Sequence, residues 1–253
     1  MNSTPEILVF STPQDLFHAA ADEVMLAAQQ AVTARGRFTI ALSGGSTPRS
    51  LFTLLATSAR EFPWPQTFFF WGDERHVLPD SPESNYGMAN EAMLSKIPVP
   101  PGNVHRILAE NPDASAAAAD YEQSLKTFFA LGADTLPRFD LVLLGMGPDG
   151  HTASLFPGTQ ALREMSRLVV ANHLAQLNTD RITLTYPVLN AARCVLFLVS
   201  GADKASTLRE VLEGAGAVEN YPAKGVQPDP GRLVWLVDQA AANLLRRAGK
   251  STS

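Results

Sequence analysis

A histidine follows an aspartate by two positions in the stretch GMGPDGHTASLFPG, which covers residues 145–158. Imidazole is the commonest general base near neutral pH, and a nearby carboxylate can fix its tautomer and orientation. A Pro-Asp-Gly turn would present His151 just after the apolar run FDLVLLGM, with Asp149 beside it. We expect His151 to be a general base oriented by Asp149. The alternative is a histidine that only hydrogen-bonds at a helix start, next to an aspartate that is merely an N-cap.

The same stretch contains GMGPDG, which matches the dinucleotide-binding pattern G-x-G-x-x-G letter for letter. That pattern needs glycines that open a long helix and an acidic residue about 20 positions further on. Here Pro157 and Gly158 would stop a helix after about two turns, and neither Glu164 nor Asp180 has the required spacing. We therefore reject a dinucleotide site.

A second candidate site is the stretch LSGGSTP after the run FTIALS. Gly44 and Gly45 would let the backbone approach a ligand closely, and Ser46 or Thr47 would cap a helix that opens with Pro48. Free amides, hydroxyls and the positive end of the helix dipole converge there, which is typical of an anion site. The lysine of a nucleotide-binding P-loop is missing, so a phosphomonoester fits better than a nucleoside triphosphate. The alternative is a plain capped helix after a glycine turn.

A third group of polar residues is WGDERHV, where Asp73 and Arg75 follow a strongly apolar strand. The arginine fork could hold a phosphate or a developing oxyanion, and the sequence does not choose between them. Asp73 could bind sugar hydroxyls or simply pair with Arg75. The alternative for all of these residues is a solvated loop with local ion pairs, and His76 is the weakest candidate.

The elements that must position these groups are short β-rich runs that alternate mostly with helical or loop patterns. The runs are EILVFS, RFTIALS, TFFFWGD, FDLVLLGM, RLVVANH, RITLTY, RCVLFLVS and RLVWLVD. Several are apolar throughout, which indicates strands with both faces covered. The sequence therefore predicts an α/β fold: a three-layer sandwich with a mostly parallel central sheet flanked by helices, Rossmann-like without a dinucleotide site. Ligands of such sheets bind outside the carboxyl ends of the strands, where the candidate residues would meet.

The clearest predicted helix has Thr12 as its cap and Pro13 in its first turn, and it ends near Gly36. Further helices are expected from residue 48 onward and over residues 83–96, 113–131, 203–212 and 239–247. No Ser/Gly linker or repeat divides the chain, which favours a single α/β domain over residues 1–253. The longest expected loops are 74–85 and 213–231.

Composition excludes several classes of protein. The chain has 253 residues, of which 45% are hydrophobic and 18% charged, and a net charge of −5 gives no reason to expect a nucleic-acid partner. It has neither the start of a signal peptide nor an apolar run of membrane-spanning length, so we expect a cytoplasmic protein with no membrane partner. The histidines lack metal-ligand spacing, and no nucleophile elbow G-x-S-x-G occurs. We expect no metal, and water as the nucleophile. Cys194, the single cysteine, lies in an apolar run and is expected in the core.

Five stretches, taken in order, resemble the 6-phosphogluconolactonases, a branch of the glucosamine-6-phosphate isomerase/6-phosphogluconolactonase family. They are LSGGSTP; FFWGDERHV with SPESNYGMANEAML; FDLVLLGMGPDGHTASLFPG; RITLTYPVLNAA; and FLVSGADKASTLREVL. The resemblance extends from about residue 6 to residue 245. The stretch AQLNTD before RITL departs from many lactonases, which have a Lys/Pro-rich approach there. That departure affects contacts at the mouth of the site rather than the chemistry.

The resemblance implies hydrolysis of 6-phospho-D-glucono-1,5-lactone to 6-phosphogluconate in the oxidative pentose phosphate pathway, without metal or organic cofactor. His151 would activate water, and Arg75 would join backbone amides at the oxyanion. The substrate phosphate would lie against residues 44–47, with Lys204 and Arg181 supplying charge. Lys204 is expected at a helix start, where the dipole disfavours a lysine unless an anion is near. Arg181 begins a strand and could instead be an ordinary surface charge.

Two other functions remain open at the level of sequence. The first is a glucosamine-6-phosphate deaminase, which typically continues His-Ile-Ala-Phe-Asn-Glu-Pro, whereas Thr152 follows His151 here. The second is a non-enzymatic sugar-phosphate sensor, which would have no need for His151 and Asp149 together. Nothing in the sequence suggests an obligate dimer, so we expect a monomer. Selectivity for the 1,5- over the 1,4-lactone, and any lid motion, are not encoded in a readable pattern.

Overall fold

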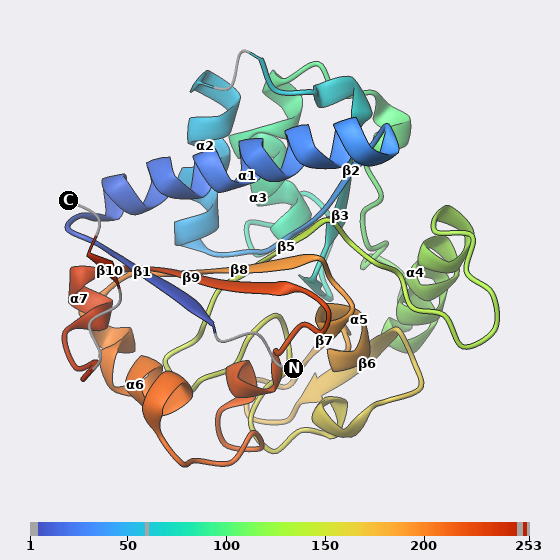
Figure 1. Ribbon diagram of the computed structural model, residues 1–253. Coiled ribbons are helices and arrows are strands. Elements are labelled where there is room, and N and C mark those ends of the chain that lie inside the picture. The colour runs from blue at the N-terminus through green and yellow to red at the C-terminus, as the bar shows by residue number, and fades with distance from the viewer. Residues whose placement is uncertain (1–4, 59–60, 247–249, 252–253) are drawn as a thin grey trace.

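The computed structural model describes residues 5–58, 61–246 and 250–251 (Figure 1). Its central sheet has seven strands in the order β10-β1-β9-β8-β5-β2-β3, and every neighbouring pair is parallel. The strands are β1 Glu6–Phe10, β2 Phe38–Leu42, β3 Thr67–Trp71, β5 Leu141–Leu144, β8 Cys194–Val199, β9 Arg232–Asp238 and β10 Lys250–Ser251. All residues of β2, β5 and β8 are buried, as expected for strands covered on both faces.

Helices cover both faces of this sheet. Figure 1 shows α1 Pro13–Arg35, α2 Ser46–Ser58 and α3 Asn85–Ala92 on one side, and α5 Tyr186–Asn190 and α6 Ala205–Glu213 on the other. The remaining helices are α4 Ala114–Phe128 and the short α7 Gln239–Ala242. Six 3-10 segments connect these elements: η1 Trp64–Gln66, η2 Leu94–Lys96, η3 Pro101–Asn103, η4 Gln160–Arg163, η5 Ala202–Lys204 and η6 Pro222–Gly225. The predicted three-layer α/β architecture is confirmed.

A second, antiparallel sheet was not predicted. It consists of β4 Asp73–Arg75, β7 Thr179–Leu184 and β6 Val169–Leu174 in the order β4-β7-β6. Helix α4 packs against β6 and β7. The loop expected over residues 74–85 therefore starts later than predicted, because Glu74 and Arg75 lie in a strand paired with β7.

Local sequence signals place the helix ends with mixed accuracy. Thr12 caps α1 by accepting a hydrogen bond from the amide of Asp15 at 3.2 Å, and the helix ends at Gly36, as predicted. Helix α2 begins at Ser46, two residues before the expected Pro48. The helix expected over residues 83–96 is shorter, because α3 ends at Ala92 and a 3-10 turn follows. The helix expected over 239–247 ends at Ala242, and residue 247 lies outside the described residues.

The core is rich in aromatic side chains from the sheet. Phe69, Phe70 and Trp71 of β3 are almost fully buried, so the aromatic run is core rather than a stacking platform. Cys194 is buried at the start of β8, as predicted. Among the helices that the structure describes, none has the length and hydrophobicity needed to cross a bilayer.

Candidate active site

A cleft of about 230 Å³ lies where β2, β3, β5 and β8 end, at the carboxyl edge of the central sheet. It brings together all the predicted site residues except Asp149 and Arg181. The residues that line it are Ser43, Gly44, Gly45, Ser46, Thr47, Pro48, Asp73, Arg75, Asn85, Gly145, Met146, Gly147, His151, Ala153, Leu198, Val199, Ser200 and Lys204. The candidate residues therefore meet at the edge where ligands of parallel sheets bind.

The candidate anion loop links β2 to α2 along one wall of this cleft. Gly45 has a φ of 104°, and α2 starts at the next residue. The amides in the first turn of a helix have no acceptor within the helix, so those of Ser46 and Thr47 can donate to a bound anion. A side chain at Gly44 would overlap the carboxamide of Asn85, so only glycine allows the loop and α3 to approach this closely.

His151 and Asp149 form the predicted pair on a tight turn after β5. The Nδ1 of His151 lies 2.6 Å from Oδ1 of Asp149, and the same oxygen accepts a hydrogen bond from the His151 amide at 3.1 Å. In the neutral imidazole, Nδ1–H donates to the carboxylate and leaves the lone pair on Nε2. The histidine side chain is 28% exposed, so it is accessible to water and to a small ligand.

Two contacts fix the position of His151, one to its backbone and one to its ring. The amide of Gly147 donates to the carbonyl of His151 at 2.9 Å, and the ring stacks on Phe156 with centroids 4.1 Å apart. A Cβ at Gly147 would overlap the imidazole, which explains the second glycine of the motif. Partial burial alone would raise the pKa of Asp149, but the hydrogen bond and charge of His151 outweigh it and leave that pKa lowered. Asp149 is therefore ionised at neutral pH and suited to orient the imidazole.

Asp73 and Arg75 enter the cleft from β4. Oδ2 of Asp73 accepts a hydrogen bond from the buried hydroxyl of Ser154 at 2.6 Å. Arg75 donates from Nη1 to the carbonyl of Glu83 at 2.9 Å, and no carboxylate lies within ion-pair distance of it in the described parts of the chain. The alternative of a solvated loop fails for Asp73, which is only 6% exposed.

Lys204 and Arg181 differ in how directly they reach the cleft. Lys204 lines it and also pairs with Asp203 at 2.6 Å. Arg181 lies outside the lining, on β7 directly opposite Arg75 across the strand pair. It donates to Thr179 Oγ1 at 3.1 Å, and burial together with the charge of Arg75 lowers its pKa. Arg181 can add positive charge beside Arg75, and its binding role stays a prediction.

Asn85 and Ser154 are among the residues that help to build the candidate site and that sequence reasoning did not single out. Asn85 lines the cleft, is 2% exposed and donates from Nδ2 to the carbonyl of Asp73 at 2.9 Å. Ser154 holds the Asp73 carboxylate, as described above. The cap Ser84 places Asn85 at a helix start and could have drawn attention to it. No local signal connects Ser154 with Asp73, which lies 81 positions away.

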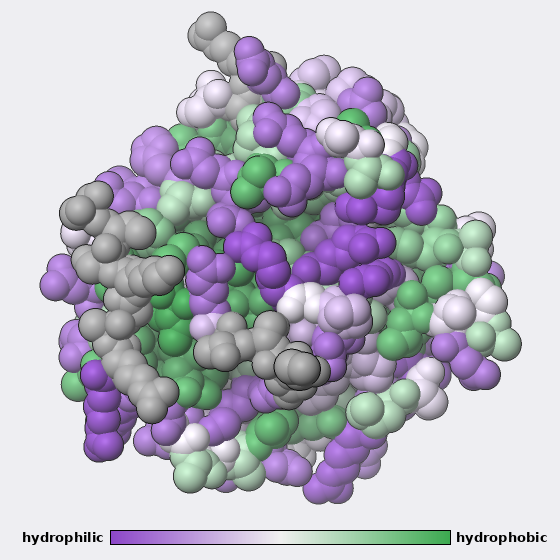
Figure 2. Space-filling view, in the orientation of Figure 1, coloured by the Kyte–Doolittle hydropathy of each residue, from purple (hydrophilic) through white to green (hydrophobic). Residues whose placement is uncertain are grey.

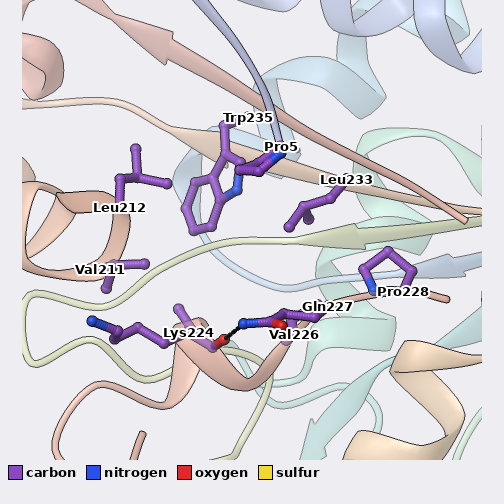
Figure 3. Close-up of a pocket in the computed structure, with 10 residues that line it drawn as sticks. Pro5, Val211, Leu212, Lys224, Val226, Gln227, Pro228, Leu233 and Trp235 are labelled. Carbon is purple, nitrogen blue, oxygen red and sulfur yellow. Dashed lines mark hydrogen bonds between the residues drawn. The ribbon is translucent and has the colours of Figure 1, made fainter. Parts of the chain in front are cut away.

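A second cavity of about 300 Å³ lies between α6, η6 and β9 (Figure 3). Its walls are mainly apolar, with Val211, Leu212, Leu233 and Trp235 among them, and Figure 2 shows apolar side chains gathered in the region of β1 and β9. Lys224 is the titratable residue of its lining, and its ammonium donates to the carbonyl of Gly214 at 2.6 Å. None of the predicted site residues lines this cavity. Over the described ranges, no group of three or more His, Cys, Asp or Glu residues is arranged to hold a metal ion.

Comparison with known proteins identifies the family of this chain. A family model described as glucosamine-6-phosphate isomerases/6-phosphogluconolactonase matches residues 11–235. The chain is 43% identical to a 6-phosphogluconolactonase of Nostoc sp., over 95% of this chain and 98% of that one. It is 42% identical to the 6-phosphogluconolactonase of Homo sapiens, with 94% and 93% covered.

Solved structures show the same similarity. A 6-phosphogluconolactonase from Trypanosoma cruzi superposes with a TM-score of 0.86 at 30% identity, covering 98% of this chain and 99% of that one. A monomeric glucosamine-6-phosphate deaminase has a TM-score of 0.76 at 23% identity, covering 94% of this chain and 99% of that one, and this likeness concerns the fold alone.

Proposed function

The chain belongs to the family of glucosamine-6-phosphate isomerases and 6-phosphogluconolactonases, and we propose that it uses His151 to hydrolyse 6-phospho-D-glucono-1,5-lactone to 6-phosphogluconate. Lactone hydrolysis in the pentose phosphate pathway is the activity that its curated relatives support. The observation that carries the proposed mechanism is the His151–Asp149 pair, at 2.6 Å, in the same cleft as the anion loop.

The first step is the attack of water on the lactone carbonyl. Nε2 of His151 accepts a proton from the water, whose oxygen bonds to the carbonyl carbon and gives a tetrahedral oxyanion. Asp149 holds the imidazole through Nδ1 and stabilises its protonated form. Arg75 and backbone amides near the glycine turns stabilise the oxyanion.

The second step opens the ring. The oxyanion collapses to the carboxylic acid as the bond from the carbonyl carbon to the ring oxygen breaks. The protonated His151 returns its proton to that oxygen, which becomes the 5-hydroxyl group. The base is thereby regenerated, and the new acid ionises to the carboxylate in water.

Binding groups hold the two ends of the substrate. The phosphate lies against Gly44, Gly45, Ser46 and Thr47, with Lys204 and Arg181 adding charge. Asp73 accepts hydrogen bonds from sugar hydroxyls. Each assigned role falls to a side chain or backbone amide of this chain.

The test compares hydrolysis of freshly generated lactone by the wild type, by His151→Ala and in buffer alone. We expect the wild type to exceed the spontaneous rate and His151→Ala to lose roughly 10²- to 10⁴-fold in kcat, the usual contribution of a general base. A variant nearly as fast as the wild type would place the base elsewhere, with Asp73 as the next candidate. A wild type no faster than buffer would overturn the function, and glucosamine 6-phosphate should then be tested as substrate.

We also propose that the protein acts as a monomer with a single α/β domain over residues 1–253, in the cytoplasm and without nucleic-acid, membrane or cofactor partners. The support is that residues between Ser43 and Lys204 of one chain supply the whole cleft. Size-exclusion chromatography with light scattering tests the oligomeric state. A mass of about 27 kDa is expected, and a concentration-independent dimer would contradict the proposal.

A further inference from the structure

Strand β4 sends its side chains to two sides. Asp73 and Arg75 line the cleft, whereas Glu74 between them does not. Because side chains alternate along a strand, Glu74 points away from the substrate. It is nevertheless almost fully buried, with 2% of its surface exposed. Burying a carboxylate costs free energy unless hydrogen-bond donors surround it, so the donors around Glu74 show which segments it joins.

Those contacts join β4 to the start of α3. Oε1 of Glu74 accepts hydrogen bonds from the amides of Asn85 at 2.7 Å and Arg75 at 2.8 Å. Oε2 accepts from the amide of Tyr86 at 2.8 Å and from the Ser84 hydroxyl at 3.2 Å. Glu74 thus satisfies two amides in the first turn of α3, a position where the helix dipole favours an anion.

Three cleft residues depend on this junction. Asp73 and Arg75 flank Glu74 directly, and Asn85 is the first residue of the helix that Glu74 caps. Asn85 also donates to the carbonyl of Asp73, and its carboxamide packs against Gly44 of the anion loop. A shift of α3 relative to β4 would therefore move groups on two walls of the cleft together.

We propose that Glu74 is a positioning residue for the lactonase reaction: it fixes β4 against the first turn of α3 and so sets Asp73, Arg75 and Asn85 around the substrate. This inference rests on the proposed function. Glu74 does not contact the cleft itself, so its effect on turnover is transmitted by its neighbours.

The electrostatics of Glu74 agree with a role other than stability. Burial raises its pKa, and the negative charge of Asp73 acts in the same direction, although the backbone hydrogen bonds oppose them. A carboxyl group with a raised pKa in the folded state stabilises the fold most at low pH, and this stabilisation is lost as the pH rises through that pKa. At neutral pH Glu74 therefore does not maximise stability.

The decisive variant is Glu74→Gln, with Glu122→Gln as its matched control. Glu122 is also a buried carboxylate that accepts two backbone amides, those of Leu168 and Val169, but it lies on α4 and does not line the cleft. In Glu74→Gln, the new carboxamide would turn an NH2 group toward amides that need an acceptor. We expect kcat per folded molecule to fall roughly 10- to 100-fold, with KM for the lactone changed less than about threefold.

Glu122→Gln should lower the thermal midpoint while leaving kcat and KM at wild-type values. The inference is overturned if folded Glu74→Gln keeps the wild-type kcat, or if Glu122→Gln loses as much. If Glu74→Gln fails to fold, the kcat of Glu74→Asp is measured in its place, because aspartate keeps the charge but has a side chain one methylene shorter. A wild-type kcat for Glu74→Asp would also overturn the inference. A wild type without activity above the spontaneous rate would instead defeat the proposed function.

Discussion

Two buried aspartates at opposite edges of the central sheet have different surroundings. Asp140 precedes β5 at the amino edge, and its carboxylate accepts hydrogen bonds from Arg35 at 2.7 and 3.1 Å and from Thr39 at 2.8 and 2.9 Å. Asp73 follows β3 at the carboxyl edge, where Ser154 donates to it at 2.6 Å. Among the residues whose side chains the structure describes, no lysine or arginine forms an ion pair with Asp73.

The two edges differ in how the charge of the buried aspartate is balanced. At the amino edge the charge of Asp140 is balanced within the protein, with Arg193 also 3.4 Å away. At the carboxyl edge Asp73, Arg75 and His151 border a common cleft, and neither Asp73 nor Arg75 is neutralised by a close ionic partner among the described residues. Charged groups that lack a close ionic partner in the protein remain available to a polar substrate. The contrast predicts that the amino edge contributes to stability and the carboxyl edge to chemistry.

The strongest test of this contrast is Arg75→Ala. Loss of an oxyanion donor typically costs roughly 10²- to 10³-fold in kcat, and we expect a loss of that size in steady-state hydrolysis of the lactone. Inhibition by inorganic phosphate distinguishes the two possible roles of the arginine. An unchanged inhibition constant agrees with the oxyanion role, whereas a roughly tenfold weaker inhibition would assign Arg75 to the phosphate.

Asp140→Asn should give the opposite pattern, with a loss of stability and little change in turnover. Removing hydrogen bonds to a charged group costs about 2 kcal/mol, which we expect as the decrease in the free energy of unfolding in urea. The kcat of the folded variant should stay within about twofold of the wild type. Asp73→Asn is the matched variant at the other edge, and a larger loss of kcat for Asp140→Asn than for Asp73→Asn would refute the contrast.

The smallest expected effect concerns chemical modification of Cys194, because this cysteine is buried at the amino edge. Burial raises the pKa of its thiol to about 11, so the protonated form dominates at pH 8 and only about 1 in 1,000 molecules carries the reactive thiolate. We expect iodoacetamide to label the native protein slowly at pH 8 and the guanidinium-denatured protein rapidly. Rapid labelling of the native protein, with loss of activity, would show that this edge is not inert.

Much of the fold and most of the site follow from local patterns. Uniformly apolar runs predicted the buried strands, and Pro157-Gly158 correctly predicted that no long helix follows the GMGPDG turn. The polar residues that follow these strands predicted the position of the cleft, since the carboxyl ends of parallel strands share an edge. His151 and Asp149 were predictable as a pair because they are only two positions apart.

The parts that could not be predicted depend on contacts between distant segments. Strand β4 has three charged residues, Asp-Glu-Arg, and no apolar alternation, so only its pairing with β7 makes it a strand. Ser154 and Asn85 join the site through partners far away in the sequence. Arg181 lies directly opposite Arg75 because of the strand register, which the sequence does not reveal, and it lies outside the lining of the cleft, so its predicted role in binding stays a prediction.

The turn that carries His151 is held by hydrogen bonds within it, between Gly147 and His151 and between Asp149 and His151, and by bonds from Thr207 and Ala223 to its carbonyls. Among the described residues, no hydrogen bond joins the turn to the anion loop. In the proposed mechanism, recognition of the phosphate and presentation of the base thus fall to segments about a hundred positions apart in the chain. Substitutions in one segment can accumulate during evolution without disturbing the other. A scaffold divided in this way can keep binding sugar phosphates while the reaction that it catalyses changes. This agrees with a family whose name joins an isomerase and a lactonase.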